Sequence, residues 1–553
     1  MKIYRIHALI CAGGQCISAG GDSFESALKK ELQAADLAEE IQIVETGCMG
    51  SCEMGPMMVI YPEGVVYVRL KPEDAEIITK EHFLKGRPVE HLMWRKEEGA
   101  FPRLEEVPFF AHQTKLVLRN CGLINPENIE EYIARDGYQG LAKAIADKDP
   151  KLVIDEIKKS GLRGRGGAGF PTGRKWETAY LQTSDIKYVV CNADEGDPGA
   201  YMDRSVLEGD PHSVIEGMAI AAYAIGAQKG YVYVRAEYPL AIKRLTHAIK
   251  QAKQSGVLGQ QILGSDFSFD LEIRVGAGAF VCGEETALLN SIEGNRGEPK
   301  KKPPFPAEKG LFGKPTVINN VETFANIPVI MTKGADFFQT IGVPNNTGTK
   351  VFSLAGKVNT TGLIEVPLGI SLRKIIFDIG GGIPHNKQFK GALTGGPSGG
   401  VIPATHIDTP IDYESLNSLG SMMGSGGLIV MDEDSCMVDI AKFFLKFTVD
   451  ESCGKCTPCR EGTKQMLNIL EKITSGQGEE GDIERLEELG NTIKQTSLCN
   501  LGQSAPNPVL STIRWFRNEY ESHIRDKKCL CNVCTLSSPV KEVKKHARKK
   551  ISH

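Results

Sequence analysis

The sequence predicts a multi-domain α/β protein, and three observations support this prediction. The chain has 553 residues, too many for one hydrophobic core, which suggests roughly three or four domains. Short apolar strands alternate with helical patterns over much of its length. Its 15 cysteines occur in clusters with short, fixed spacings, which is typical of metal sites rather than of a disulfide framework.

The composition is that of an ordinary soluble globular protein. The hydrophobic fraction is 41%, the charged fraction is 24% and the formal net charge is -4, so no nucleic acid or membrane partner is required. No apolar run reaches the ~18 residues needed to cross a bilayer. The start, MKIYRIHALI, lacks the cleavage site of a secretory signal. We therefore expect a cytoplasmic protein without direct membrane insertion.

Residues 1–94 are expected to form a compact α/β domain. The pattern predicts strands at 3–10 and 41–44, a helix at 24–37, a hairpin at 57–68 that turns at 62–64, and a last helix opening at Pro72. This order of elements is thioredoxin-like. The charged, proline-containing stretch 95–108 is expected to be a linker.

Three further domains and a tail are expected after the linker. Residues 109–340 alternate strands and helices, as in a Rossmann-like α/β domain. Residues 341–430 are rich in glycine and β-branched residues, which favours a small β-rich domain. Four amphipathic patterns at 435–448, 461–474, 482–496 and 507–523 predict a helical bundle over 431–520. Residues 521–553 form a basic tail, expected to be solvated at its end.

Two cysteine groups have the spacing of iron–sulfur ligands. Cys11 and Cys16 follow the first predicted strand, and Cys48 and Cys52 follow the second, so two loops can present four thiolates to one ferredoxin-type cluster. Structural zinc fits the wide first spacing poorly; buried or redox-active cysteines remain the alternative. The CGKCTPC motif, with Cys453, Cys456 and Cys459, can wrap a 4Fe-4S cluster whose fourth ligand is Cys499.

The tail holds a third group of soft ligands. His523, Cys529, Cys531 and Cys534 lie within twelve residues, a set compatible with tetrahedral zinc. Unliganded thiols in a disordered tail are the alternative. The remaining cysteines, Cys121, Cys191, Cys282 and Cys436, are expected to be small buried apolar residues.

A glycine-rich loop, SGLRGRGGAGFPTGRKW from Ser160 to Trp176, is the main candidate for phosphate or flavin binding. Glycines let backbone N–H groups approach a phosphate, and Arg163, Arg165, Arg174 and Lys175 supply positive charge. The nominal G-x-G-x-x-G match is weak because a helical stretch precedes it instead of a strand. A plain flexible loop is the alternative.

Three segments place small polar residues at strand ends: 191–204, 276–294 and 314–323. Their carboxylates and amides suit ribose hydroxyls, a flavin ring edge and a nicotinamide amide. Each segment alone could equally be a turn or a helix cap. The prediction of a cofactor site therefore depends on the three segments occurring together.

These motifs resemble the NADH-binding flavoprotein subunit of respiratory complex I and its relatives in soluble hydrogenases and formate dehydrogenases, over about residues 108–520. The resemblance implies a β-grasp, SLBB-like module in 341–430 and a 4Fe-4S cluster beside the flavin. The FMN ligands that it implies are Gly164, Arg165, Gly166, Gly167, Lys175, Asn192, Asp194, Glu195, Gly283, Glu284, Asn319 and Asn320. The implied NADH contacts are Phe170, Phe280, Phe305, Asp197, Glu285 and Lys302.

Two departures from the complex I pattern favour a particular branch of this family. The thioredoxin-like domain is fused to the chain, and Asp197 and Phe280 stand where complex I relatives usually have glutamate and often tyrosine. The chain is most similar to the beta (diaphorase) subunit of multimeric, NAD(P)-dependent [FeFe]-hydrogenases of the electron-bifurcating type. A complex I-type subunit, a formate dehydrogenase beta subunit and an electron-wiring subunit without flavin are the alternatives.

The resemblance implies hydride exchange between NAD(P)(H) and FMN, followed by single-electron transfer through one 4Fe-4S and one 2Fe-2S cluster. The residues expected at the chemistry are Glu195, Glu284 and Glu285. The implied partners are a small thioredoxin-like 2Fe-2S subunit and a cluster-rich hydrogenase or formate dehydrogenase subunit, with ferredoxin as a further candidate. Electron bifurcation, the choice between NAD and NADP, and the zinc site are left open.

Overall fold

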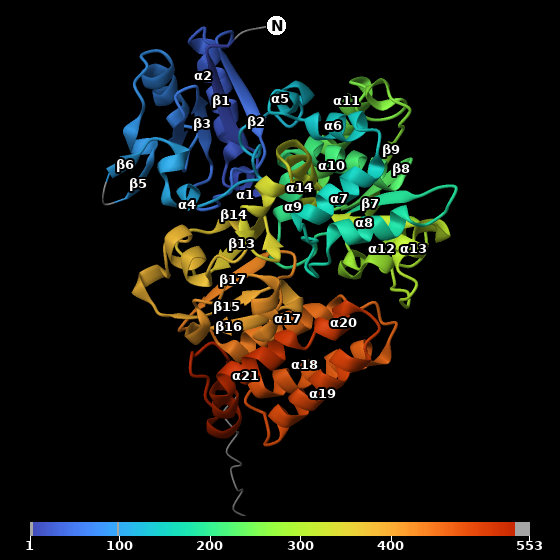
Figure 1. Ribbon diagram of the computed structural model, residues 1–553. Helices are drawn as coiled ribbons and strands as arrows, with labels where there is room; N and C mark the ends of the chain where they lie inside the picture. Colours follow the sequence, from blue (N-terminus) through green and yellow to red (C-terminus); the bar gives the residue numbers. More distant parts are fainter. Residues whose placement is uncertain (1–3, 97–98, 537–553) are drawn as a thin grey trace, which may run out of the picture.

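The computed structural model describes residues 4–96 and 99–536. Figure 1 shows the N-terminal domain, the large α/β domain, a β-rich part and the C-terminal helices packed together. Within these described ranges no helix is both long and apolar enough to cross a membrane. The last lysines and arginines of the predicted tail lie outside the described residues.

The N-terminal domain has the predicted order of elements around a four-stranded sheet, β2-β1-β3-β4. β1 and β2 are parallel, and the other neighbours are antiparallel. A buried apolar face of α2, which includes Phe24, Leu28 and Leu32, packs into the core of this domain. The elements are β1 (Ile6–Cys11), α1 (Gly14–Ser18), α2 (Gly21–Ala34), β2 (Ile41–Thr46), β3 (Met58–Tyr61), β4 (Val65–Tyr67), α3 (Asp74–Ile77) and η1 (Ile78–Phe83).

The predicted linker is partly a structured hairpin, which corrects the expectation for residues 95–108. β5 (Trp94–Lys96) and β6 (Gly99–Phe101) pair in antiparallel register. The N–H of Val66 donates to the carbonyl of Pro102 at 2.8 Å, so the segment extends the N-terminal domain. η3 (Leu104–Glu106) and α4 (Pro108–Ala111) follow. Charge and proline content alone did not reveal this pairing.

The large α/β domain is built on a four-stranded, fully parallel sheet with the order β10-β7-β8-β9. Its strands are β7 (Tyr188–Ala193), β8 (Lys229–Arg235), β9 (Asp270–Gly276) and β10 (Thr316–Asn320). The principal helices are α5 (Ile129–Ile133), α6 (Gln139–Ala146), α7 (Pro150–Ser160), α8 (Thr172–Tyr180), α9 (Met202–Gly209), α10 (Pro211–Ile225), α11 (Pro239–Gln254), α12 (Glu285–Ile292) and α14 (Val321–Lys333). α10 is buried along almost its whole length.

A mixed five-stranded sheet follows, with the order β14-β13-β17-β15-β16. β13 runs parallel to β17, whereas the other neighbouring pairs are antiparallel. The strands are β13 (Thr349–Gly356), β14 (Gly362–Pro367), β15 (Phe389–Thr394), β16 (Gly400–Pro403) and β17 (Gly427–Asp432).

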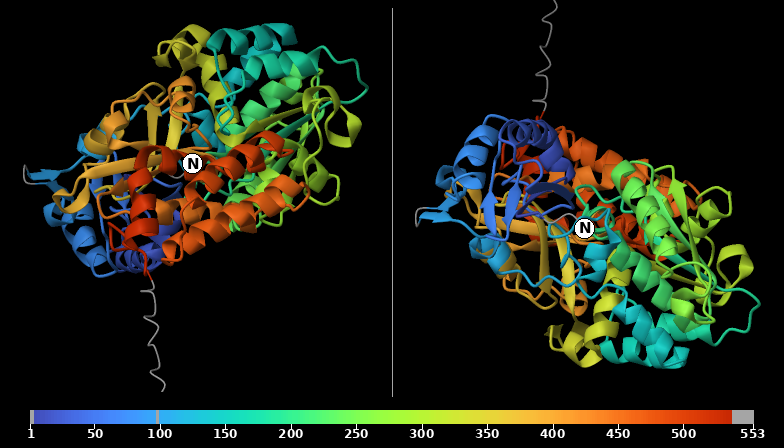
Figure 2. Two further views of the ribbon diagram at one scale, coloured as in Figure 1. Left: turned by 90° about the horizontal axis from the view of Figure 1, so that it is seen from below. Right: turned by 90° about the horizontal axis from the view of Figure 1, so that it is seen from above.

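The C-terminal part contains the four predicted helices, with ends within a few residues of the expectation. They are α17 (Met437–Asp450), α18 (Thr463–Thr474), α19 (Asp482–Thr496) and α21 (Asn507–Glu521), with the short α20 (Asn500–Ser504) before the last. α17 packs on α18 and α21, and α19 packs on the same two helices. Seen from below, these helices cover one side of the molecule (Figure 2). A bundle results because each helix buries one apolar stripe.

The parts share cores rather than meeting through loose linkers. Leu9 and Phe110 belong to the same buried cluster as Phe352 and Ile364 of the mixed sheet. Leu363 of that sheet belongs to the core of the large α/β domain. This packing fixes the cysteine loops relative to the parallel sheet.

Candidate functional site

The predicted flavin residues gather at the carboxyl edge of the parallel sheet. In this sheet β8 and β9 lie in chain order on one side of β7, whereas β10, the last strand in the sequence, lies on the other side of β7. Asn192 and Asn320 are opposite each other at the ends of β7 and β10. Such a reversal of strand order opens a crevice at the strand ends, where ligands of α/β sheets bind.

The glycine-rich loop lies against this switch point. A Cβ added at Gly166 would lie 3.2 Å from the Cβ of Asn320. Gly167 has φ +119°, and Gly169 has φ +64°, where a Cβ would come within 2.6 Å of the Tyr413 ring. The loop therefore requires glycine for both backbone conformation and close approach.

The side chain of Arg165, a predicted FMN ligand, points into the protein interior. It is fully buried, and its guanidinium donates to the carbonyls of Thr349, Arg163 and Thr347 at 2.9, 2.9 and 2.7 Å. Its own backbone N–H donates to Thr323 Oγ1 at 2.9 Å. Because the guanidinium is buried and bonded to these carbonyls, the Arg165 side chain braces the loop.

Lys175, another predicted FMN ligand, lies next to the end of β10. Its Nζ donates to the carbonyl of Ile318 at 2.9 Å. Burial lowers the pKa of Lys175, while the nearby carboxylate of Glu285 opposes that effect. An incoming anionic group would favour the charged ammonium at this position.

Asp194 and Arg235 form an incompletely satisfied pair at the ends of β7 and β8. Their closest charged atoms are 3.6 Å apart. Both carboxylate oxygens of Asp194 and Nη1 of Arg235 are buried without a hydrogen-bond partner. Burial raises the pKa of Asp194 to about 7, and Arg235 acts against this rise. Because buried polar groups are normally paired, these atoms fit a polar ligand such as FMN.

The amide of Asn192 links this pair to the next segment. Its Nδ2 donates to the carbonyl of Gly283 at 2.8 Å, and its Oδ1 accepts from the N–H of Asp194. Arg235 was missed by the sequence reasoning. The available signal was an arginine at the end of the short apolar run KGYVYVRA, residues 229–236.

Glu195 follows Asp194 and is held by the first turn of α9. Its carboxylate accepts from the N–H groups of Asp203 and Arg204, each at 3.1 Å. Burial raises the pKa of Glu195 to about 7, although these backbone donors lower it. The Asn320 amide donates to Asp203, so β7, α9 and β10 are tied together at this edge.

Glu284 and Glu285 share Lys302 but have different local roles. Glu284 caps α12 by accepting from the N–H groups of Thr286 and Ala287 at 2.9 and 3.0 Å. Lys302 Nζ lies 3.0 Å from Glu284 and 2.8 Å from Glu285. Glu285 is thus the freer carboxylate of the two.

The predicted nicotinamide contacts fall into exposed and packed groups. Phe170 and Phe305 are 51% and 53% exposed, as a stacking surface requires. Phe280 packs edge-to-face on Phe447. Asp197 accepts from Ser425, and burial raises the pKa of Asp197 to about 6. Asn319 accepts from the Trp176 indole at 3.0 Å, which gives it a supporting position.

The CGKCTPC loop packs against this same domain. Cys453, Cys456, Cys459 and Cys499 join one apolar cluster with residues of the 280–293 segment. Cys453 and Cys456 are electrostatic neighbours of Cys459, and Cys453 is one of Cys499. A Cβ at Gly502 would lie 3.0 Å from that of Cys459. The four predicted ligands therefore converge, as a cluster site requires.

The N-terminal cysteines also converge. The neighbouring thiols of Cys16 and Cys48 are the main causes that lower the pKa of Cys11. A Cβ at Gly13 would lie 3.2 Å from Cys48 Sγ, and one at Gly55 would lie 2.7 Å from Cys16 Sγ. Two glycines thus leave the space around the sulfur atoms that a cluster needs.

The third ligand group differs from the sequence expectation. Ligand atoms of Cys436, His523, Cys529 and Cys534 lie within 4.8 Å of one another. Cys436 therefore replaces Cys531, and its assignment as an ordinary buried cysteine is also corrected. Cys531 instead has its Sγ 3.2 Å from Lys390 Nζ and 3.3 Å from the carbonyl of Ser435. Cys436, at the start of α17, is distant in sequence from the tail, so spacing could not find it.

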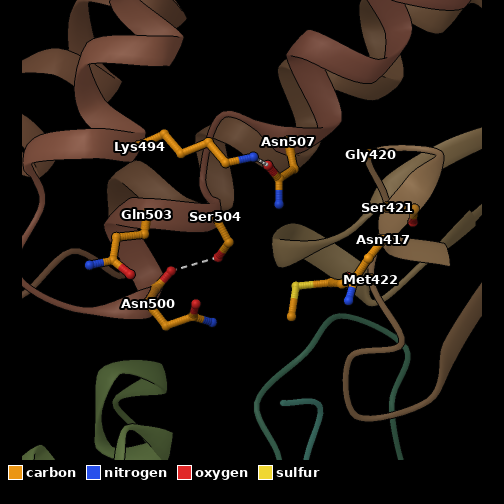
Figure 3. Close-up of a pocket in the computed structure, with 9 residues that line it drawn as sticks. All are labelled: Asn417, Gly420, Ser421, Met422, Lys494, Asn500, Gln503, Ser504 and Asn507. Carbon is orange, nitrogen blue, oxygen red and sulfur yellow. Dashed lines mark hydrogen bonds between the residues drawn. The ribbon is translucent and has the colours of Figure 1, made fainter. Parts of the chain in front are cut away.

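A separate polar pocket of about 330 Å³ lies between the bundle and the segment before β17 (Figure 3). Its lining comes from residues 417–422 and 494–507. Lys494 donates a hydrogen bond to Asn507 at 3.1 Å along the helical wall of this pocket. It is formed by different residues from those of the β7–β10 edge.

The fold and site define a flavin- and iron–sulfur-dependent oxidoreductase subunit, and family models support this class. Residues 157–329 match the model described as the Nuo51 FMN-binding domain. Residues 439–523 match the NADH-ubiquinone oxidoreductase-F iron-sulfur binding region, and residues 2–82 match the thioredoxin-like [2Fe-2S] ferredoxin.

Individual relatives place the chain more narrowly. It is 62% identical to the NADP-reducing hydrogenase subunit HndC of Solidesulfovibrio fructosivorans over 423 residues, covering 76% of this chain and 86% of that one. It is 45% identical to an NADH-quinone oxidoreductase subunit of Rhizobium meliloti (strain 1021), covering 75% and 98%. The crystal structure of NAD+-reducing [NiFe]-hydrogenase in the H2-reduced state matches with a TM-score of 0.66 and 30% identity, covering 95% of this chain and 85% of that one. The chain belongs to this family of NADH-quinone oxidoreductase and hydrogenase flavoprotein subunits.

Proposed function

We propose that the chain is the diaphorase subunit of a multisubunit NAD(P)-dependent hydrogenase in the cytoplasm. The observation that carries the proposal is the Asp194–Arg235 pair at the carboxyl edge of the parallel sheet, in which three buried polar atoms lack a hydrogen-bond partner. The CGKCTPC loop and Cys499 pack against the same domain. When bound there, FMN supplies the conversion between hydride transfer and single-electron transfer. The similarity to HndC favours a hydrogenase over a quinone or formate dehydrogenase complex.

The proposed binding roles follow the geometry. The glycine loop and Lys175 suit the phosphate, whereas Asn192, Asp194 and Arg235 suit polar atoms of the flavin. Glu195, Asn319 and Asn320 support this edge. Phe170 and Phe305 offer exposed rings for the nicotinamide cofactor, and Glu285 with Lys302 offers polar contacts beside them. Residues placed in this way would orient the two cofactors, and such positioning would make hydride transfer nearly unimolecular.

The proposed partners are a small thioredoxin-like 2Fe-2S subunit and a cluster-rich hydrogenase subunit, with ferredoxin as a further electron partner. Cys453, Cys456, Cys459 and Cys499 would hold the 4Fe-4S cluster, and Cys11, Cys16, Cys48 and Cys52 the 2Fe-2S cluster. We also assign the mixed sheet as the β-grasp module. In support, its first and last strands, β13 and β17, are parallel neighbours at its centre.

The flavin site is tested by Asp194→Ala in the purified complex. We expect loss of most FMN and of NAD(P)H:viologen activity, because the change removes carboxylate oxygens that the ligand would satisfy. Asp149→Ala is the control, since that carboxylate caps α7. FMN content and activity with NADH and NADPH are measured. Unchanged flavin content and activity in Asp194→Ala would reject the assigned site.

We further propose structural zinc at Cys436, His523, Cys529 and Cys534. Three sulfurs and one imidazole match a closed tetrahedral zinc site. His523 Nδ1 lies 2.7 Å from the carbonyl of Glu519, so it donates there and leaves Nε2 toward Cys436 at 3.7 Å. The site would join the start of α17 to the segment after α21.

Zinc analysis of two cysteine variants tests this ligand set. Cys436→Ser should lower zinc content several-fold, because one thiolate ligand is lost. Cys531→Ser should keep full zinc content, although the sequence alone favours Cys531 as a ligand. Equal zinc content in both variants, or loss only in Cys531→Ser, contradicts the structural assignment.

A further inference from the structure

The N-terminal cysteine loops face the FMN-binding domain rather than the outer end of the molecule. A Cβ at Gly47 would lie 2.2 Å from the Cα of Gly209, at the end of α9. The N–H of Cys52 donates to the carbonyl of Thr361 at 3.1 Å. In Figure 1 the N-terminal domain accordingly lies beside both α9 and β14. The proposed 2Fe-2S site is therefore at an internal interface.

Tyr201 reaches one of the proposed cluster ligands across this interface. Its hydroxyl oxygen lies 3.2 Å from Cys52 Sγ. A cysteine that ligates iron is a thiolate and has no proton to give. The phenol must then be the donor, and the sulfur the acceptor.

The segment that contains Tyr201 also contacts the edge of the sheet where we propose that flavin binds. Tyr201 is the N-cap residue of α9, and two residues in the first turn of that helix, Asp203 and Arg204, donate their N–H groups to Glu195. The side chain of Asp203 accepts from Asn320. A short stretch therefore contacts Cys52 at one end and the β7–β10 edge at the other.

A hydrogen bond to a ligating sulfur alters the energetics of a cluster in a known direction. One-electron reduction adds a negative charge to the cluster, and a donor aimed at the thiolate stabilises that charge. Hydrogen bonds to the sulfurs are among the factors that set iron–sulfur reduction potentials. The donor also orients the ligand that it contacts.

We propose that Tyr201 is a positioning residue that donates to Cys52 and raises the reduction potential of the N-terminal 2Fe-2S cluster. The proposal rests on the cluster ligation by Cys11, Cys16, Cys48 and Cys52 put forward above. It adds a residue of the FMN-binding domain to the determinants of that cluster. Electron acceptance by the N-terminal domain thereby depends on how it docks on the flavin domain.

The test compares Tyr201→Phe with wild type in the purified full-length chain, separated from the proposed small 2Fe-2S subunit, so that only one 2Fe-2S cluster contributes to the signal. Redox titration monitored by the electron paramagnetic resonance signal of the reduced 2Fe-2S cluster gives its potential. Tyr201→Phe keeps the ring and removes only the donor, so we expect a lower potential with unchanged iron and sulfide content. Tyr61→Phe is the matched control. Tyr61 is 38% exposed and pairs with His7 on β1, at the end remote from Cys11.

A second variant keeps the test decisive if the phenylalanine variant does not assemble. Incorporation of 3-fluorotyrosine at position 201 preserves the shape and strengthens the donor, so the potential should rise above wild type. An unchanged potential in an assembled Tyr201→Phe or fluorotyrosine protein overturns the role of Tyr201. Absence of any 2Fe-2S signal from the separated wild-type chain would instead refute the proposed cluster, a result separable from the first.

Discussion

Burial makes it costly in free energy to ionise the carboxyl groups at the strand ends. Asp194, Glu195 and Asp197 have pKa values raised to about 7, 7 and 6, in each case chiefly by burial. Raised carboxyl pKa values are typical of functional sites as well as of structural networks. Here the unpaired oxygens of Asp194 favour the functional interpretation.

The raised pKa of Asp194 predicts that the stability of the flavin-free protein depends on pH. Its folded-state pKa, about 7, exceeds the unfolded value of about 3.9, so the folded state retains the proton between these values. The free energy of unfolding must fall as pH rises through this range. Relative to wild type, Asp194→Asn should gain on the order of 2 kcal/mol between pH 5 and pH 8.

Denaturant unfolding of the two flavin-free proteins at several pH values measures that gain. Glu195 and Asp197 are present in both proteins, so their contributions largely cancel. A difference between the proteins that does not vary with pH would show that Asp194 is not the titrating group.

At the level of elements, the conformation of the glycine-rich loop depends on its contacts with neighbouring segments. Gly164 donates its N–H to the carbonyl of Phe170 at 2.8 Å and accepts from the Tyr413 hydroxyl through its own carbonyl at 2.9 Å. The loop thus rests on α16 (Tyr413–Ser418) on one side and on the end of β10 on the other. Its shape depends on two domains.

Gly169→Ala should lower FMN content several-fold in the purified protein. The added Cβ would meet the Tyr413 ring at 2.6 Å at a backbone with φ +64°, so the loop must shift. Gly226→Ala is the control, because Gly226 has φ +75° with nothing within 4 Å of the added Cβ. It carries the backbone strain of about 1–2 kcal/mol without the collision. Equal FMN content in both variants would contradict the role assigned to this contact.

At the scale of the whole molecule, docking of the N-terminal domain depends on close backbone contact and one buried cation. Arg244 is 1% exposed, and its guanidinium donates to the carbonyls of Thr46 and Glu208 at 3.2 and 2.7 Å. This links the end of β2 to α9. The two domains therefore behave as one unit in the described residues.

Gly47→Ala should loosen this interface while each domain stays folded. A Cβ at Gly47 would lie 2.2 Å from the Cα of Gly209, and neither backbone can give way locally. Hydrogen exchange in residues 44–52 and in α9 is expected to accelerate at least several-fold. Gly86→Ala, in open space at φ +65°, should leave those rates unchanged. Unaltered exchange in Gly47→Ala would show that the contact is not needed for docking.

Much of the fold could be predicted, because local patterns fix it. The thioredoxin-like order, the four C-terminal helices and the two iron–sulfur spacings come from periodicity and short-range cysteine motifs, which act within a few residues of chain. The hairpin formed by β5 and β6 was missed because it is short and is held by contact with β4. The bracing contacts of the Arg165 side chain and the position of Arg235 were missed for a related reason, since tertiary packing decides the burial and the hydrogen-bond partners of each guanidinium.

Residue types and their spacing already indicate the chemistry that the chain can hold: clustered thiolates, a glycine loop, and carboxylates and amides at strand ends. Which of these groups meet depends on tertiary packing. Packing places Cys436 instead of Cys531 beside His523, leaves both carboxylate oxygens of Asp194 without a hydrogen-bond partner and brings Tyr201 to Cys52. The contacts of Cys436 with His523 and of Tyr201 with Cys52 join residues 87 and 149 positions apart, so packing alone could establish them.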